Sequence, residues 1–217
     1  MGIIGVVAAL TLPNLNSSTG DREKVAKVKK IYQNLSDIHG RMEAVYGPYK
    51  EWNCGAYSSM HVCYAERMSD FLKVSKTCKN SNDCKDLGNS GDDIGYLLPD
   101  GVVITTTTSG IANQSAVIED TVTINIDIGG IKGSHTNGKE KFKFIVTKEK
   151  GVMPSSDHRN HPSYLDDCVK GNGGTRFMCT GWVVNFGNMD YLKTKSDGTC
   201  KNNDKIKLDG VNNTTCK

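Results

Sequence analysis

Residues 25–46, VAKVKKIYQNLSDIHGRMEAVY, decide the fold, because their apolar side chains recur at steps of three and four residues. Charged residues lie between the apolar positions, which are Val25, Val28, Ile31, Tyr32, Leu35, Ile38, Met42, Val45 and Tyr46. The spacing predicts an amphipathic helix with one face on a core. The helix is expected to begin after the polar run 14–21, NLNSSTGD, and to end at Gly47-Pro48, since Gly followed by Pro typically ends a helix.

An uninterrupted apolar stretch, GIIGVVAALTL at residues 2–12, precedes this helix. It is shorter than the roughly 20 residues that span a bilayer, and it lacks the basic start and the small-residue cleavage site of a secretory signal peptide. A buried core helix is one interpretation. The apolar residues surround the helix axis on all sides, however, which suits lipid or a helix-packed interior better than the surface of a globular domain. We expect Pro13 to bend or break the helix.

The net charge of +3 arises from 27 basic and 24 acidic residues that are spread along the chain. The sequence has no basic stripe interleaved with aromatic residues, so it indicates no nucleic-acid partner. A local cluster of lysines occurs in the predicted amphipathic helix, at Lys24, Lys27, Lys29 and Lys30. Its simplest interpretation is a solvated helix face, and the alternative is charge pairing between subunits.

Alternating apolar residues in the middle of the chain predict β-strands. Residues 95–98 and 102–105 flank a Pro99-Asp100-Gly101 turn, which indicates a strand, a turn and a second strand. Residues 121–128 and 141–146 alternate apolar side chains with polar or charged ones, as half-buried strands do. We therefore expect an antiparallel meander of about four strands packed on the amphipathic helix.

The remaining segments show little periodicity. Residues 49–94 are expected to form disulfide-pinned loops with a short helix around 65–72. The tail from Gly151 onward is expected to be rich in loops, with Trp182-Val183-Val184 as its clearest apolar piece. The sequence shows no internal repeat and no interdomain linker, and its 217 residues fit one domain.

Eight cysteines are the most informative part of the composition, because an even set in a loop-rich chain usually forms disulfides. The alternative is zinc, but no Cys-x-x-Cys occurs, and His158 and His161 lie far in sequence from a matching pair. Disulfides imply an oxidising compartment, such as the periplasm, the cell surface or the medium. Sequence proximity favours four pairs, with other connectivities left open: Cys54–Cys63, Cys78–Cys84, Cys168–Cys179 and Cys200–Cys216.

Motifs of common enzyme families do not occur: the sequence has no G-x-S-x-G, H-E-x-x-H, P-loop or dinucleotide-binding fingerprint. Its histidines are scattered, and the even cysteine set favours disulfides over a catalytic thiol. We therefore expect no catalytic residue and no cofactor. Three acidic loops, 86–93, 127–140 and 197–209, could hold calcium through oxygen ligands. None has the EF-hand spacing, and turn formation by Asn, Asp and Gly is the simpler explanation.

Four segments resemble the type IV pilins and the pseudopilins of type II secretion systems. GIIGVVAALTLPNL at 2–15 resembles the second half of the prepilin N-terminal helix, whose run of Ile, Val and Ala leads to Pro-Asn-Leu. LPDGVVI at 98–104, DIGGIKGSHTNGKEKFKF at 127–144 and TGWVVNFGNMDYLK at 180–193 are similar to recurrent sheet, loop and tail segments of these proteins. The order of parts is similar too: an apolar helix, an amphipathic continuation and a small antiparallel sheet.

The resemblance implies an α+β, pilin-like fold, in which a long N-terminal helix packs on a small antiparallel β-sheet with disulfide-pinned loops. Residues 1–47 would form the helix, with an apolar half at 2–15 and an amphipathic half at 21–47. Residues 48–217 would form the globular head. The apolar half would be the assembly helix, and its expected contact residues are Ile3, Ile4, Val6, Val7, Leu10, Leu12 and Pro13.

The resemblance further implies a structural subunit of an extracellular or periplasmic type IV pilus-like filament, held in the inner membrane before assembly. Its partners would be copies of itself or other pilin-like subunits. The alternative is a secreted, disulfide-rich adhesin or binding domain with a pilin-derived N-terminus. A hydrolase is a more distant third interpretation, which would require a His and a carboxylate that converge in a pocket.

The chain departs from the family pattern in two places. Prepilins carry a basic leader, a Gly before the cleaved bond and a Glu a few residues later, and none of these precedes Met1. The resemblance implies that this Glu pairs with the terminal amine of a neighbouring subunit, so a filament subunit would have a mature start upstream of Met1. The family's Asp-x-Asn-Gly turn appears here as Asp127-Ile128-Gly129-Gly130, which removes one candidate calcium ligand.

Overall fold

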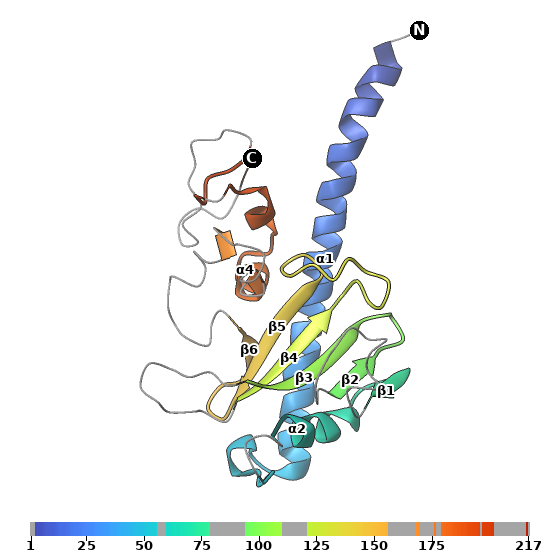
Figure 1. The fold of residues 1–217 in the computed structure, drawn as a ribbon. Helices are drawn as coiled ribbons and strands as arrows, with labels where there is room; N and C mark the ends of the chain where they lie inside the picture. Colours follow the sequence, from blue (N-terminus) through green and yellow to red (C-terminus); the bar gives the residue numbers. More distant parts are fainter. Residues whose placement is uncertain are drawn as a thin grey trace.

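The computed structural model describes residues 3–55, 60–78, 94–109, 121–155, 168–169, 176, 179–195, 197–201 and 216, with side chains described from Thr19 onward except at 108, 109 and 121. Within these residues the fold is α+β, with one helix packed on a six-stranded antiparallel sheet (Figure 1). The predicted combination of a helix, an antiparallel sheet and disulfides is therefore confirmed.

Helix α1 (Ile3–Tyr46) contains the predicted amphipathic stretch. Tyr32 stacks on Phe144 of the sheet, with the ring centroids 5.5 Å apart. Val45 and Tyr46 are exposed by 63% and 37%, so the buried stripe ends before the last turn of the helix. The helix stops at Gly47, whose φ of 82° is typical of a glycine that ends a helix. The buried stripe consists of Val25, Val28, Ile31, Leu35, Ile38 and Met42.

The predicted break between two helices does not occur, because α1 continues without interruption through Pro13 and Gly20. A proline in a helix interior removes one backbone hydrogen bond and costs about 3 kcal/mol, and a glycine costs about 1 kcal/mol. Extending an existing helix is still easier than starting another, because nucleation is the unfavourable step. The polar residues of 14–21 therefore lie inside one helix and do not cap a second one.

In the described part of the chain the sheet has six strands in sequence order, each antiparallel to its neighbours. They are β1 (Lys76–Cys78), β2 (Ile94–Leu97), β3 (Val103–Ser109), β4 (Thr121–Asp127), β5 (Lys141–Thr147) and β6 (Gly151–Pro154). The four predicted strands correspond to β2 through β5, which confirms the meander. Strands β1 and β6 extend it at both edges, and with three and four residues they are too short to be predicted from periodicity in the sequence.

One face of the sheet forms the core with α1. Ile104 and Ile126 are cross-strand partners, as are Ile124 and Phe144, and each is exposed by 1% or less. Val122 lies on the same face as Ile124 and Ile126, because residues two apart in a strand point to the same side. Burial of one such side chain contributes about 1.5–3 kcal/mol. The central strands therefore contribute much of the stability of the head.

The region between α1 and β1, expected as loops, contains η1 (Tyr49–Glu51) and α2 (Met60–Ser69). The short helix expected at 65–72 thus begins and ends earlier in the sequence. Packing of α2 against β3 and β4 gives it a buried side. The spacing of the apolar residues on this side is visible in the sequence, although Cys63 suggests a loop. The buried residues of α2 are Met60, His61, Tyr64, Ala65 and Met68.

The tail expected to be rich in loops contains α4 (Cys179–Phe186) and η6 (Asp190–Lys193). The apolar piece predicted at 182–184 is part of α4, which packs on α1 and on the β5–β6 edge of the sheet. At this edge the Thr180 hydroxyl accepts a hydrogen bond from the Lys143 backbone N–H at 2.9 Å. The pairing of β5 with β6 ends at Phe144, so α4 provides the acceptor for the next amide of β5, that of Lys143.

Candidate functional site

The predicted assembly residues lie in the first part of α1, which extends past the sheet (Figure 1). This apolar stretch and the stripe that packs on the sheet therefore belong to one helix. Among the described residues, no helix combines the length and the apolar content needed to cross a membrane. The backbone of the predicted residues is helical, and their side chains lie outside the described part: Ile3, Ile4, Val6, Val7, Leu10, Leu12 and Pro13.

Three disulfides join described cysteines: Cys54–Cys63, Cys168–Cys179 and Cys200–Cys216. They are the pairs that sequence proximity favours, with sequence separations of 9, 11 and 16. Cys78 is buried, and its predicted partner Cys84 lies outside the described residues. The first disulfide joins the segment after η1 to α2, and the second joins Cys168 to the start of α4.

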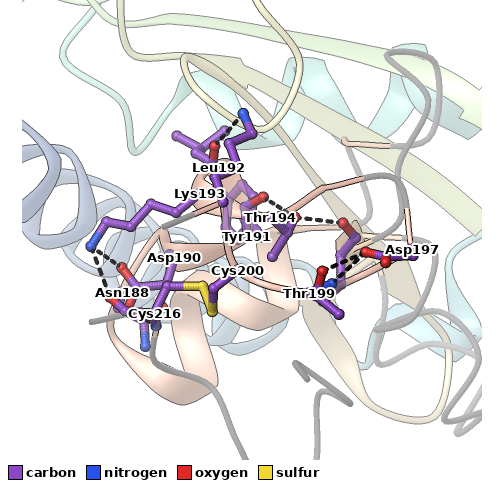
Figure 2. The surroundings of a disulfide bond; sticks show 12 residues. Asn188, Asp190, Tyr191, Leu192, Lys193, Thr194, Asp197, Thr199, Cys200 and Cys216 are labelled. Atoms are coloured by element: carbon purple, nitrogen blue, oxygen red, sulfur yellow. Dashed lines mark hydrogen bonds and ion pairs between the residues drawn. A yellow bond between two sulfur atoms is a disulfide. The ribbon is translucent and has the colours of Figure 1, made fainter. Parts of the chain in front are cut away.

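The Cys200–Cys216 disulfide lies beside a buried carboxylate (Figure 2). Asp190, exposed by 7%, accepts a hydrogen bond from the Cys216 backbone N–H at 2.9 Å. Its other carboxylate oxygen forms an ion pair with Lys193 Nζ at 2.7 Å. Hydrogen bonds to a charged acceptor are stronger than neutral ones. Asp190 therefore fastens Cys216 to η6, and the disulfide joins the same residue to Cys200.

We expect Asp190→Asn to lower the free energy of unfolding by about 1–2 kcal/mol, because the amide keeps one acceptor oxygen but loses the charge that strengthens both contacts. Urea unfolding with the disulfides intact measures the loss. The matched control is Lys193→Met, which removes a half-exposed partner whose ion pair contributes less than about 1 kcal/mol. Equal losses in the two variants would contradict a dominant role for the buried carboxylate.

The carboxylate of Asp127, in a loop predicted as a candidate calcium site, has partners within that loop for both of its oxygens. Asp127 Oδ1 accepts from the Gly129 N–H at 2.9 Å, and Oδ2 lies 2.6 Å from His135 Nδ1. In the part of the chain that the structure describes, no cluster of three or more His, Cys, Asp or Glu could hold a metal ion. Of the other candidate loops, 86–93 and most of 197–209 lie outside the described residues.

The loop after β4 also contacts α1, at the place where the helix leaves the head. Lys27 Nζ donates a hydrogen bond to the Ile128 carbonyl oxygen at 3.1 Å. A hollow of about 220 Å³ next to this contact is lined by residues of the helix and of the loop, including Gly20, Lys24 and Glu140. Lys27 therefore connects the helix to the sheet, in addition to the solvated role expected for the lysine cluster.

A groove of about 380 Å³ lies between α1, the end of α2 and the β2–β3 turn. The Arg41 guanidinium lies over the Phe71 ring, 4.9 Å from its centroid, on one side of this groove. The volume falls within the range of small-molecule sites. The charged lining residues carry both signs and therefore indicate no ligand class; they are Asp37, Arg41, Lys73 and Asp100.

No role for His39 was predicted from the sequence; the structure buries it beside the buried Tyr64 and the half-exposed Glu43. His39 Nδ1 lies 3.1 Å from the Tyr64 hydroxyl oxygen, and Nε2 lies 3.8 Å from Glu43 Oε1. These side chains are of the types that relay protons, but Tyr64 is exposed by only 1%, which leaves no room for a substrate at its hydroxyl. The sequence signal was the helical spacing of His39 from Leu35 and Met42 in the buried stripe.

Comparisons of the chain with known protein families, curated proteins and solved structures found no match. The disulfide-linked head and the projecting helix therefore have to be interpreted from their own residues and geometry.

Proposed function

We propose that this chain is a structural subunit of a type IV pilus-like filament and that it assembles through the apolar N-terminal stretch of α1. The observation that carries the proposal is the continuity of one helix. Residues 3–12, apolar on all sides, extend past the sheet from the same α1 whose stripe packs on the head. A stretch of this kind needs an apolar cover on every side. Copies of the same helix, bundled at the centre of a filament, would supply it.

The geometry of the projecting helix favours a filament over a closed oligomer. The helix leaves the head at one end, beside the loop that follows β4. Its partners in a bundle are the helices and heads of copies displaced along the same axis, so the two contacting surfaces differ. Contacts between different surfaces are heterologous, and they build open helical assemblies when the rotation does not close.

Before assembly, the inner membrane would cover the same apolar residues, because lipid tails are as apolar as packed helices. The disulfides support export, since they form and persist in oxidising compartments such as the periplasm and the cell surface. Each disulfide closes a short loop of the head and restricts the unfolded chain, which suits a subunit that works outside the cell. The partners in this proposal are copies of the chain or other pilin-like subunits.

Assembly of the purified full chain after detergent removal tests the proposal, with electron microscopy and pelleting as the measurements. We expect Val7→Asp to abolish filaments, because burial of an unpaired carboxylate in a helix bundle costs several kcal/mol. The matched control is Ala26→Asp, which places the same charge at an exposed position of the same helix. We expect this control to assemble like the unmodified chain.

Two results would contradict the proposal in different ways. If the unmodified chain remains monomeric after detergent removal at every concentration tested, the filament is wrong, and a secreted binding domain becomes the better interpretation. If Val7→Asp assembles as well as Ala26→Asp, a filament exists but the apolar stretch does not form its core. Circular dichroism of both variants checks that the head remains folded.

A further inference from the structure

His39 of α1 lies where four elements meet. Its ring centroid is 5.6 Å from that of Tyr49 in η1 and 6.0 Å from that of Tyr64 in α2. On the β6 side, Gly151 has a φ of +63°, and a Cβ atom there would approach the imidazole to 2.9 Å. Strand β6 therefore reaches the ring because glycine has no side chain. The result is an imidazole that is exposed by 7% and enclosed by aromatic rings and backbone.

The neutral imidazole fits this enclosure. Glu43 Oε1 lies 3.8 Å from Nε2, which is too far for a hydrogen bond, and its negative charge favours the ring proton on that nitrogen. Nδ1 then accepts a hydrogen bond from the Tyr64 hydroxyl at 3.1 Å. Burial raises the pKa of Tyr64 well above its ordinary value, so this hydroxyl keeps its proton. A second ring proton, on Nδ1, would point at the Tyr64 O–H. Two donors would then face each other, and the Tyr64 hydroxyl hydrogen would have to rotate away.

The charges that face His39 do not compensate for a buried imidazolium. Among the residues that the structure describes, the titratable groups in contact with the ring are Glu43 from α1, Tyr64 from α2 and Tyr49 from η1, and β6 faces it with the Gly151 backbone. Neither tyrosine carries charge at acidic pH. Burial lowers the pKa of His39 below its ordinary value of 6.5, and the half-exposed Glu43 carboxylate opposes this shift only in part.

The same residues attach η1 and α2 to the helix. Glu43 Oε1 accepts a hydrogen bond from the Tyr49 backbone N–H at 2.8 Å, next to the end of α1. The Cys54–Cys63 disulfide links the segment after η1 to α2. We propose that His39 is an acid-sensitive anchor: protonation of its imidazole loosens η1 and α2 from α1, while the disulfide keeps these two segments joined. The anchor is a property of the head and does not depend on filament assembly.

The sign of the effect follows from linkage. When η1 and α2 separate from α1, His39 becomes solvated and recovers its ordinary pKa of 6.5, whereas the packed form binds its proton only at lower pH. The contribution of neutral His39 to the stability of the packed form is therefore fully present above pH 6.5 and decreases as the pH falls below 6.5. The opening equilibrium constant is expected to rise by up to about tenfold per pH unit until the pKa of the packed form is reached.

Hydrogen exchange of the full chain, followed by mass spectrometry between pH 7.5 and pH 5, tests the anchor after correction for intrinsic exchange rates. We expect peptides from α2 to exchange faster below pH 6.5 in the unmodified chain and to show no such acid response in His39→Gln. The matched control is His135→Gln, a histidine substitution in the loop after β4, which should retain the response. Peptides from β4 and β5 should remain protected in all three proteins.

A second variant keeps the test decisive if His39→Gln folds poorly. Glu43→Gln removes a carboxylate that favours the imidazolium but retains an acceptor for the Tyr49 N–H, so the acid response of α2 should extend to lower pH. A purely structural role of Glu43 would leave the pH profile unchanged. The proposal is overturned if α2 exchange does not depend on pH after correction. It is equally overturned if His39 titrates at or above pH 6.5 in the folded chain by NMR.

Discussion

Replacement of Trp182 with alanine is expected to lower the free energy of unfolding by about 3–5 kcal/mol. Trp182 is fully buried in α4, and its ring packs edge-on against those of Phe186 and Tyr191, with centroids 5.1 Å and 6.1 Å away. Its indole N–H donates to Asn188 Oδ1 at 2.9 Å. The alanine variant therefore loses a large apolar surface, leaves a cavity beside Phe186 and Tyr191, and removes one of the two donors to Asn188 Oδ1, the other being the Asp190 backbone N–H.

Urea unfolding at neutral pH with intact disulfides measures this loss, and Trp182→Phe is the matched control. Phenylalanine keeps an aromatic ring in the site but cannot donate to Asn188, so we expect a loss of about 1–2 kcal/mol. The difference between the two variants is the contribution of the ring. A loss below about 1 kcal/mol for Trp182→Ala would show that α4 is not a stabilising part of the core.

The second large effect is expected at Gly130, where alanine should destabilise the head by about 2–5 kcal/mol. Its φ of +64° is unfavourable for alanine by about 1–2 kcal/mol. A Cβ atom would also lie 2.3 Å from the Gly101 carbonyl oxygen, which is backbone and cannot rotate away. Separation of the two segments to a normal contact adds about 1–3 kcal/mol of strain. The loop after β4 would then move away from the β2–β3 turn.

Gly101→Ala is the control that separates these two causes. Gly101 has a φ of +83°, and a Cβ atom there would meet nothing within 4 Å, so only the backbone penalty applies. Thermal and urea unfolding should therefore give a smaller loss, about 1–2 kcal/mol. If the two alanine variants are equally destabilised, the close approach of the two segments does not contribute to stability.

Much of the fold could be predicted from the sequence where periodicity was long enough to measure. The stripe from Val25 to Met42 and the alternation in β4 and β5 each follow the period of their element, and the structure buries the predicted sides. The disulfide pairs among the described cysteines could be predicted for a different reason. Cysteines close in sequence can meet without a large loss of chain entropy, so proximity is informative in a loop-rich head.

The elements that escaped prediction are short or depend on distant neighbours. Strands β1 and β6 are three and four residues long, and they exist because β2 and β5 offer them unpaired backbone groups. Helix α4 is stabilised by its contacts with α1, which sequence periodicity over eight residues does not reveal. A polar segment such as 14–21 is ambiguous, because the same residues cap a new helix or continue an old one.

The His39 site could not be predicted because its parts come from four separate elements. A histidine within an apolar stripe indicates burial, but its partners Tyr64 and Gly151 become neighbours only when α2 and β6 are in place. Glu43, one helical turn after His39, was the partner that sequence spacing could have suggested. Tertiary contacts, which no local pattern encodes, determine whether such a pair is exposed or enclosed.

The order of contacts along the chain has a consequence for folding. Strands of the meander pair with their sequence neighbours, whereas α1 packs on β6 and α4, which come much later in the chain. During synthesis the strands can pair as they emerge, because closing short loops costs little entropy. Docking of the helix is complete only after β6 and α4 have appeared. Its apolar stripe is therefore the last large surface to be covered, and an unfinished chain offers it to chaperones and proteases.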